Sequence, residues 1–237
     1  MAAYTSTHRR ARNQPAPPVL STVEAIRALW GEKSVQILLT VAVVLLAYLL
    51  GSFPAGYLLG KLSGVNVLRF ASGRTGGTNV LRAAGALAGL GTGVLDAGKG
   101  YLAVWLAGQI TGSPLAASLA GGAVILGHCY SIFLGFHGGG GVATSLGATG
   151  VICLPLGLAM FVLLVTVIAI TRMASVGSLT VTTLLPITLL VLGLIGTLPL
   201  IYVLYGVLAW MVIVYSHRPN IRRLIEGTER RLGEPKE

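Results

Sequence analysis

Residues 36–60, QILLTVAVVLLAYLLGSFPAGYLLG, contain no charged side chain. A run of this length is long enough to cross the hydrocarbon core of a bilayer as a helix. The mean hydropathy of the chain is +0.82. Charged residues make up only 10% of it, whereas they make up roughly a quarter of a soluble domain. The chain is therefore expected to be a helical protein that crosses a membrane several times.

Six further apolar segments indicate how many times the chain crosses. They cover residues 84–108, 113–135, 142–154, 156–170, 176–196 and 199–216, and the segment at 142–154 is short for a span. The expected fold is all-α and polytopic, with about seven transmembrane helices in a membrane domain of residues 35–229. Residues 1–34 are expected to form a disordered or interfacial tail, and residues 230–237 a C-terminal tail.

The charges in the apolar part of the chain are almost all positive. From Lys61 to Arg218 there are seven Lys and Arg residues, whereas Asp96 is the single acid. Anionic substrates or anionic lipid headgroups are the partners that such a set favours. Nucleic acid is disfavoured, because long apolar runs separate the cations and no basic stripe forms.

The distribution of these cations predicts an orientation. Residues 61–83 carry cations and no acid, whereas the turns on the other side, near 112, 155 and 197, carry no charge. The positive-inside rule then places four regions on the cytoplasmic face of the cell membrane: 61–83, 136–141, Arg172 and the C-terminus. Seven spans would put the basic N-terminal tail outside, so either the tail is exported against the rule or the span count differs by one.

A polar island, SGRTGGTNVLR at residues 72–82, interrupts the apolar sequence. No hydrocarbon-facing segment tolerates such a composition, so the island must line water, protein or a polar ligand. Its hydroxyls, amide, backbone N–H groups and two arginines offer the chemistry of a phosphate site.

Three other islands fall on the same expected face, at FHGGGGVAT (136–144), TRMASVGS (171–178) and SHRPNIRRLIEGTE (216–229). Together with GSFPAGYLLGKL at 51–62 and DAGKG at 96–100, their order and content resemble the acyl-phosphate-dependent glycerol-3-phosphate acyltransferases, the PlsY family. The resemblance extends from about Leu50 to Glu229.

This resemblance implies a membrane enzyme that transfers a fatty acyl group from acyl phosphate to glycerol 3-phosphate, the first step of phospholipid synthesis. The products would be lysophosphatidic acid and phosphate, with membrane lipid as the surroundings and with no metal and no cofactor. An acyl phosphate is a mixed anhydride with a good leaving group, so the protein mainly needs to hold two anions together. By the same resemblance, the substrate's own phosphate helps to remove the hydroxyl proton.

Carried over by position, the resemblance also implies the site residues. Those expected to be catalytic are Ser72, Arg82, His217 and Asn220. Those expected to bind substrate are Arg74, Gly76, Gly77, Thr78, Asn79, His137, Gly138, Gly139, Gly141 and Ser178.

Other polar residues favour plainer roles. Asp96 and Lys99 lie one turn apart within a span, which favours a buried structural pair over catalytic groups. His128 is expected to be a satisfied polar group within the bundle, and Arg172 an interfacial anchor. The glycine runs do not indicate a nucleotide site, because no strand precedes them and no Gly-Lys-Ser/Thr follows.

The chain departs from the family pattern KGGKGVAT, since His137 and Gly140 replace its two lysines. The second lysine is a phosphate contact in the family, and Arg74 stands where the family usually has Asn. One hypothesis is that Arg74 supplies the missing cation, with His137 assisting when protonated. The alternatives are a catalytically impaired paralogue that binds phospholipid precursors, or an organic-anion transporter. The transporter is disfavoured, because the chain lacks related halves and a train of polar residues through the midplane.

Overall fold

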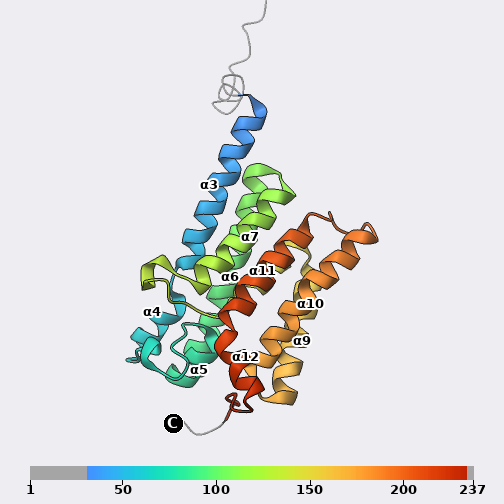
Figure 1. The fold of residues 1–237 in the computed structure, drawn as a ribbon. Helices are drawn as coiled ribbons and strands as arrows, with labels where there is room; N and C mark the ends of the chain where they lie inside the picture. Colours follow the sequence, from blue (N-terminus) through green and yellow to red (C-terminus); the bar gives the residue numbers. More distant parts are fainter. Residues whose placement is uncertain (1–30, 234–237) are drawn as a thin grey trace, which may run out of the picture. The chain divides into compact units, whose positions relative to one another are not determined.

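The computed structural model describes residues 31–233 and separates the chain into two units, Met1–Leu38 and Leu39–Glu237. The second unit contains the helical bundle (Figure 1). Within the described residues there is no strand, only an isolated bridge between Ser131 and His137. The prediction of an all-α fold is therefore confirmed. Most of the predicted N-terminal tail lies outside the described residues.

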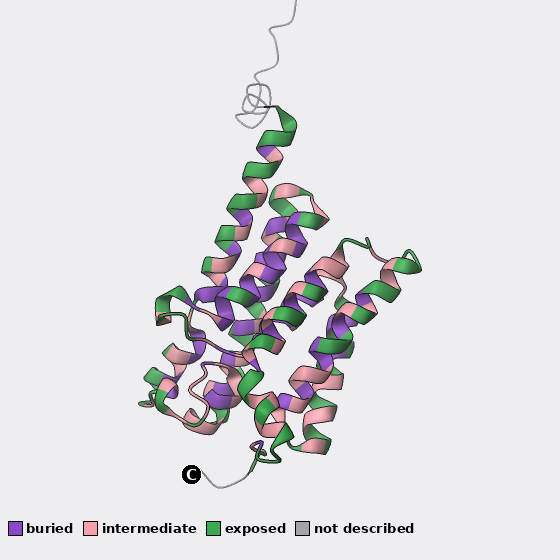
Figure 2. Ribbon diagram, in the orientation of Figure 1, coloured by how far each residue is buried: buried purple, intermediate pink, exposed green. Residues whose placement is uncertain are grey.

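In chain order the helices are α3 (Glu32–Ser52), α4 (Ala55–Leu62), α5 (Gly77–Ala84), α6 (Ala86–Thr111), α7 (Pro114–Cys129), α8 (Val142–Ile152), α9 (Leu154–Thr171), α10 (Ala174–Leu194), α11 (Tyr202–Ser216) and α12 (Arg218–Ile225). Short 3₁₀ turns at Val67–Arg69 and Ile132–Leu134 lie in two of the loops. Helix α6 packs against α5, α7 and α8, whereas α11 packs against α7 and α10. Helix α7 is buried along most of its length (Figure 2).

Each predicted apolar segment coincides with helix, with two differences. The first segment is divided at Phe53 and Pro54 into α3 and α4, and the third ends as helix at Cys129, so that residues 130–141 form a loop. By length and composition, the stretch Glu32–Leu62, which contains α3 and α4, and the helices α9 and α10 are able to cross a membrane. At about 1.5 Å per residue, α8 is too short to cross a hydrocarbon core of about 30 Å.

The break between α3 and α4 is stabilised by polar side chains from elsewhere in the bundle. Pro54 has no N–H and ends the regular hydrogen-bond ladder. Lys99 Nζ donates to the Phe53 carbonyl at 3.2 Å, and Ser131 Oγ donates to the Ser52 carbonyl at 2.5 Å. The carbonyl groups that the break releases are therefore paired inside the protein, as a lipid environment requires.

Helices α6 and α8 approach each other so closely that glycine is required at their contact. A β-carbon at Gly100 would overlap the Thr144 carbonyl, and one at Gly147 would overlap the Ala97 carbonyl. This agrees with the use of small residues where membrane helices pack most tightly. The contact holds the start of α8 beside the middle of α6.

Replacing Gly147 by Ala is therefore expected to destabilise the protein by about 1–3 kcal/mol, because the backbones of α6 and α8 must separate. Gly150→Ala, on the same helix, is the matched control, since a β-carbon there would meet nothing within 4 Å. Thermal unfolding of both variants in detergent measures the difference. An equal effect of the two substitutions would contradict this account of the packing.

Candidate active site

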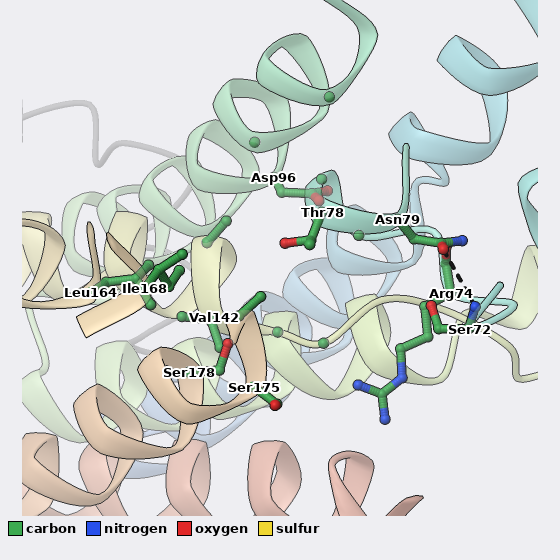
Figure 3. A pocket seen from close by; sticks show the side chains of 18 of the residues that line it. Ser72, Arg74, Thr78, Asn79, Asp96, Val142, Leu164, Ile168, Ser175 and Ser178 are labelled. Carbon is green, nitrogen blue, oxygen red and sulfur yellow. Dashed lines mark hydrogen bonds between the residues drawn. The ribbon is translucent and has the colours of Figure 1, made fainter. Parts of the chain in front are cut away.

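A cavity of about 480 Å³ lies between the polar loops and the apolar helices. Its polar end is lined by residues 72–79, by Arg82 of α5, and by residues of α12 and the segment after it. Residues 72–79 comprise the end of the loop before α5 and the first three residues of α5, and they are called the 72–79 loop below. Its other end is lined by apolar side chains of α6, α8 and α9, namely Leu90, Val94, Leu146, Phe161, Leu164 and Ile168. In the view of Figure 3, Leu164 and Ile168 lie at one end, Ser72 and Arg74 lie at the other, and Ser175 and Ser178 lie between them.

The side chain of Asn79 organises the first polar loop. Its Nδ2 donates to the carbonyls of Val67, Phe70 and Arg74 at 3.1, 3.2 and 2.8 Å. Its Oδ1 accepts from the Ser72 N–H at 3.4 Å, and the residue is only 4% exposed. Asn79 borders the cavity as expected, but its amide is occupied within the protein. The Asn79 side chain therefore positions the loop, and its role in substrate binding stays a prediction.

The glycines at 138 and 139 join the second polar loop to the first. The Thr75 N–H donates to the Gly138 carbonyl at 3.2 Å, and the Gly139 N–H donates to the His128 carbonyl at 3.0 Å. β-Carbons at these glycines would overlap the carbonyl oxygen and the ring of His128. Neither glycine lines the cavity. Both support the site through the main-chain hydrogen bonds that hold the second loop in place.

Arg74 extends from the first loop into the cavity. Its Nη2 donates to the Ser216 carbonyl at the end of α11, and burial lowers the pKa of its guanidinium from the usual value. A β-carbon at Gly140 would lie 3.9 Å from Arg74 Nη1 and 3.1 Å from His217 Cε1. The guanidinium therefore lies next to the position at which the family pattern has a lysine.

His217, between α11 and α12, is neutral at pH 7. Its Nδ1 lies 2.8 Å from the Ile213 carbonyl, which accepts only, so Nδ1 carries the proton. The residue is 4% exposed, and burial together with the Arg74 guanidinium lowers the pKa of His217 to about 4. With its proton on Nδ1, the imidazole offers Nε2 as a hydrogen-bond acceptor.

One carboxylate near α12 orders a group of residues of which only Asn220 was expected at the site. Asn220 Nδ2 donates to Glu229 Oε1 at 2.7 Å, and Arg223 Nε donates to Glu229 Oε2 at 2.8 Å. Arg223, Glu229 and Arg230 line the cavity beside Asn220. Asn220 and Arg223 are three residues apart, which places both on one face of α12. This spacing is the feature of the sequence that could have indicated Arg223 as a site residue.

Arg230 and Leu232, which fall in the expected C-terminal tail, both contact the rest of the structure. Arg230 lines the cavity, and the Leu232 N–H donates to the Arg172 carbonyl at 2.7 Å. This carbonyl is available because Arg172 ends α9 in the left-handed conformation, with a φ of 60°. The main chain of Arg172 thus holds the residues that follow Glu229.

The buried pair expected from Asp96 and Lys99 is confirmed. Lys99 Nζ lies 3.0 Å from Asp96 Oδ1, and His128 Nδ1 lies 3.4 Å from the same oxygen. All three side chains are at most 6% exposed. Asp96 and His128 also border the cavity, which the expectation of a purely structural role did not anticipate.

The structure brings together most of the residues expected at the site. Those lining the cavity are Ser72, Arg74, Gly76, Gly77, Thr78, Asn79, Arg82, Gly141, Ser178, His217 and Asn220. His137 is the clearest correction, because it is exposed and its Nδ1 lies 2.9 Å from the Gly135 carbonyl. It does not line the cavity, so it is in no position to assist Arg74 there.

Protonation of His217 should destabilise the fold. Because its folded pKa of about 4 lies below the ordinary value of 6.5, the unfolded chain binds the proton more tightly. The stability that the neutral ring contributes is complete above pH 6.5 and is lost as the pH falls toward 4. We expect the loss to reach up to about 3 kcal/mol.

The test is to measure thermal unfolding in detergent between pH 7 and pH 4 for the native chain and for His217→Asn. The variant lacks the imidazole and therefore its protonation. The native chain should lose more stability over that interval. Parallel pH profiles would contradict the pKa assigned to His217.

Known proteins are similar to this chain over most of its length. Residues 41–227 match the sequence model of the family described as glycerol-3-phosphate acyltransferase. The glycerol-3-phosphate acyltransferase of Rubrobacter xylanophilus is 40% identical over 196 residues, covering 83% of this chain and 96% of its own. That of Jannaschia sp. is 44% identical over 190 residues, covering 80% of this chain and 91% of its own.

Solved structures agree with these relatives. PlsY, an integral membrane glycerol 3-phosphate acyltransferase, superposes in its glycerol 3-phosphate form with a TM-score of 0.74 at 34% identity. The match covers 82% of this chain and 96% of that one. Its lysophosphatidic acid form gives a TM-score of 0.73 at the same identity, covering 82% and 95%. With this match over most of its length and a polytopic α-helical fold, the chain belongs to the glycerol-3-phosphate acyltransferase family of integral membrane proteins.

Proposed function

We propose that this protein transfers a fatty acyl group from acyl phosphate to glycerol 3-phosphate, giving lysophosphatidic acid and phosphate. The observation that carries the proposal is a single cavity with glycine loops and arginines at one end and an apolar lining at the other. A reaction between a polar phosphate ester and an acyl donor needs both environments in one place. The family to which the chain belongs favours the same reaction.

The reaction requires the protein mainly to bind two anionic substrates next to each other. The hydroxyl oxygen of glycerol 3-phosphate attacks the acyl carbonyl carbon, the bond between that carbon and the bridging oxygen breaks, and phosphate leaves. The hydroxyl proton passes to a phosphate oxygen, so no side chain has to act as a strong base. Placing the two reactants in contact and neutralising the developing charge provide the acceleration.

Each part of the polar end has a role in this proposal. Ser72, Arg82 and the start of α5 hold phosphate oxygens, since the N-terminus of a helix favours anions. Neutral His217 accepts a hydrogen bond through Nε2 from the glycerol hydroxyl that does not react, while Asn220 is held in place by Glu229. Ser178, on α10, also borders the cavity.

The cavity is proposed to open toward the cytoplasm. The loop that follows α4 carries Arg69 and Arg74, the helix α12 carries three arginines, and both lie at the same end of the bundle (Figure 1). The positive-inside rule favours the cytoplasmic side for such regions. Both phosphorylated substrates would then reach the site from the same aqueous compartment.

Turnover by the purified chain tests the function. Supplied with acyl phosphate and glycerol 3-phosphate, it should release phosphate and form lysophosphatidic acid in equal amounts. In sealed vesicles of inverted orientation, glycerol 3-phosphate added outside should be used, whereas right-side-out vesicles should use it only after they are opened. Folded protein that binds the substrates without turnover would favour the impaired paralogue instead.

Arg74 is proposed to supply the positive charge that Gly140 cannot. Removal of one of several phosphate cations costs about 2–4 kcal/mol of transition-state stabilisation, so Arg74→Asn should lower kcat/KM by roughly 30- to 1000-fold. Adding Gly140→Lys should recover activity once the His217 ring shifts slightly, because the new side chain starts 3.9 Å from Arg74 Nη1.

The matched control is Arg69→Asn, which removes an exposed cation from the same polar region away from the cavity. It should retain native kcat/KM. Native activity in Arg74→Asn would refute the compensation by Arg74.

A further inference from the structure

The first turn of α10 is a helix N-terminus that faces the cavity. Ala174, Ser175 and Ser178 belong to this helix and line the cavity wall. The residue before the helix, Met173, caps it with no side-chain hydrogen bond. The Thr171 hydroxyl accepts from the Met173 N–H just before the helix, and the positive end of this 21-residue helix borders the cavity.

Ser175 adds a second and independent observation. It is only 4% exposed, and its Oγ is buried without a hydrogen-bond partner. Within residues 31–233 only Thr144 Oγ1 shares this property among side-chain oxygen and nitrogen atoms, and Thr144 does not line the cavity. A buried hydroxyl without a partner costs free energy, so one on a cavity wall indicates that a ligand supplies the missing contact.

The chemistry of the two features points to an anion. A helix N-terminus offers N–H donors and a positive partial charge, and a serine hydroxyl adds one more donor. A phosphoryl oxygen is an acceptor that suits all of these groups. The proposed reaction brings two phosphoryl groups into the cavity, and the 72–79 loop with Arg82 has been assigned to one of them.

The neighbours of this turn distinguish the two substrates. Helix α9 leads directly into α10, and its residues Phe161, Leu164 and Ile168 form part of the apolar lining. In Figure 3, Ser175 and Ser178 lie between this apolar group and Arg74. Of the two substrates, acyl phosphate is the one that joins a phosphoryl group to a long apolar chain.

We propose that Ser175 and the first turn of α10 form a second anion subsite, which binds the phosphoryl group of the acyl donor. This inference rests on the proposed function and assigns one of its two substrates to a defined place. Ser175 donates its hydroxyl hydrogen to a phosphoryl oxygen, and glycerol 3-phosphate is held separately at the 72–79 loop.

Ser175→Ala tests the subsite. Its KM for acyl phosphate should rise roughly ten- to hundredfold, as expected for loss of a hydrogen bond to a charged oxygen, while the KM for glycerol 3-phosphate stays unchanged. Its unfolding temperature without ligand should stay the same or rise, because an unpaired buried hydroxyl is removed. A structural role would lower the unfolding temperature instead. Thr183→Val, which removes an exposed hydroxyl from the same helix, should match the native chain in all three measurements.

A binding measurement separates failure of this inference from failure of the proposed function. A non-hydrolysable acyl phosphonate should raise the unfolding temperature of the native chain and of Thr183→Val, but much less that of Ser175→Ala. Unchanged KM for acyl phosphate and equal stabilisation by the phosphonate would overturn the subsite, even if the enzyme is active. A rise in KM for glycerol 3-phosphate alone would overturn its assignment to the acyl donor.

Discussion

The hydrogen bond from the Thr75 N–H to the Gly138 carbonyl joins two polar loops that are far apart in the sequence. The cavity depends on this junction, because each loop forms part of its polar end. Asn79 holds the first loop through its side-chain amide, and the His128 carbonyl holds the second through the Gly139 N–H. Glycine is required in the second loop, where the backbone runs against His128 without room for a β-carbon.

The charges around the cavity follow from the cost of ions in a membrane protein. The two carboxylates that line it are already paired, Asp96 with Lys99 and Glu229 with Arg223. Arg74 instead donates to the main-chain carbonyl of Ser216. The polar end therefore carries an excess of positive charge, which an incoming phosphate neutralises.

The fold could be predicted because lipid restricts the backbone to helices or closed barrels, and the apolar runs of this chain have helical lengths. The division at Phe53 and Pro54 was not predicted. It depends on Lys99 and Ser131, which approach the released carbonyls only in the folded bundle. The short helix α8 was recognised as unusual from its length alone.

The residues of the candidate site were predictable where a motif placed them on one wall. Ser72, Arg82 and His217 all border the cavity. Sequence alone did not reveal that the Asn79 amide is occupied by carbonyls, that His137 is directed away, or that Ser175 lacks a partner. Each of these depends on distances between segments that the order of residues does not encode.

A crystal structure of this protein with glycerol 3-phosphate and a non-hydrolysable acyl phosphonate tests the central claim, that one cavity holds both substrates. Two phosphorus positions are expected, one at the 72–79 loop and one at the start of α10, with the acyl chain along Leu164 and Ile168. A single phosphorus position in the cavity, or an acyl chain that lies outside it, would contradict the account.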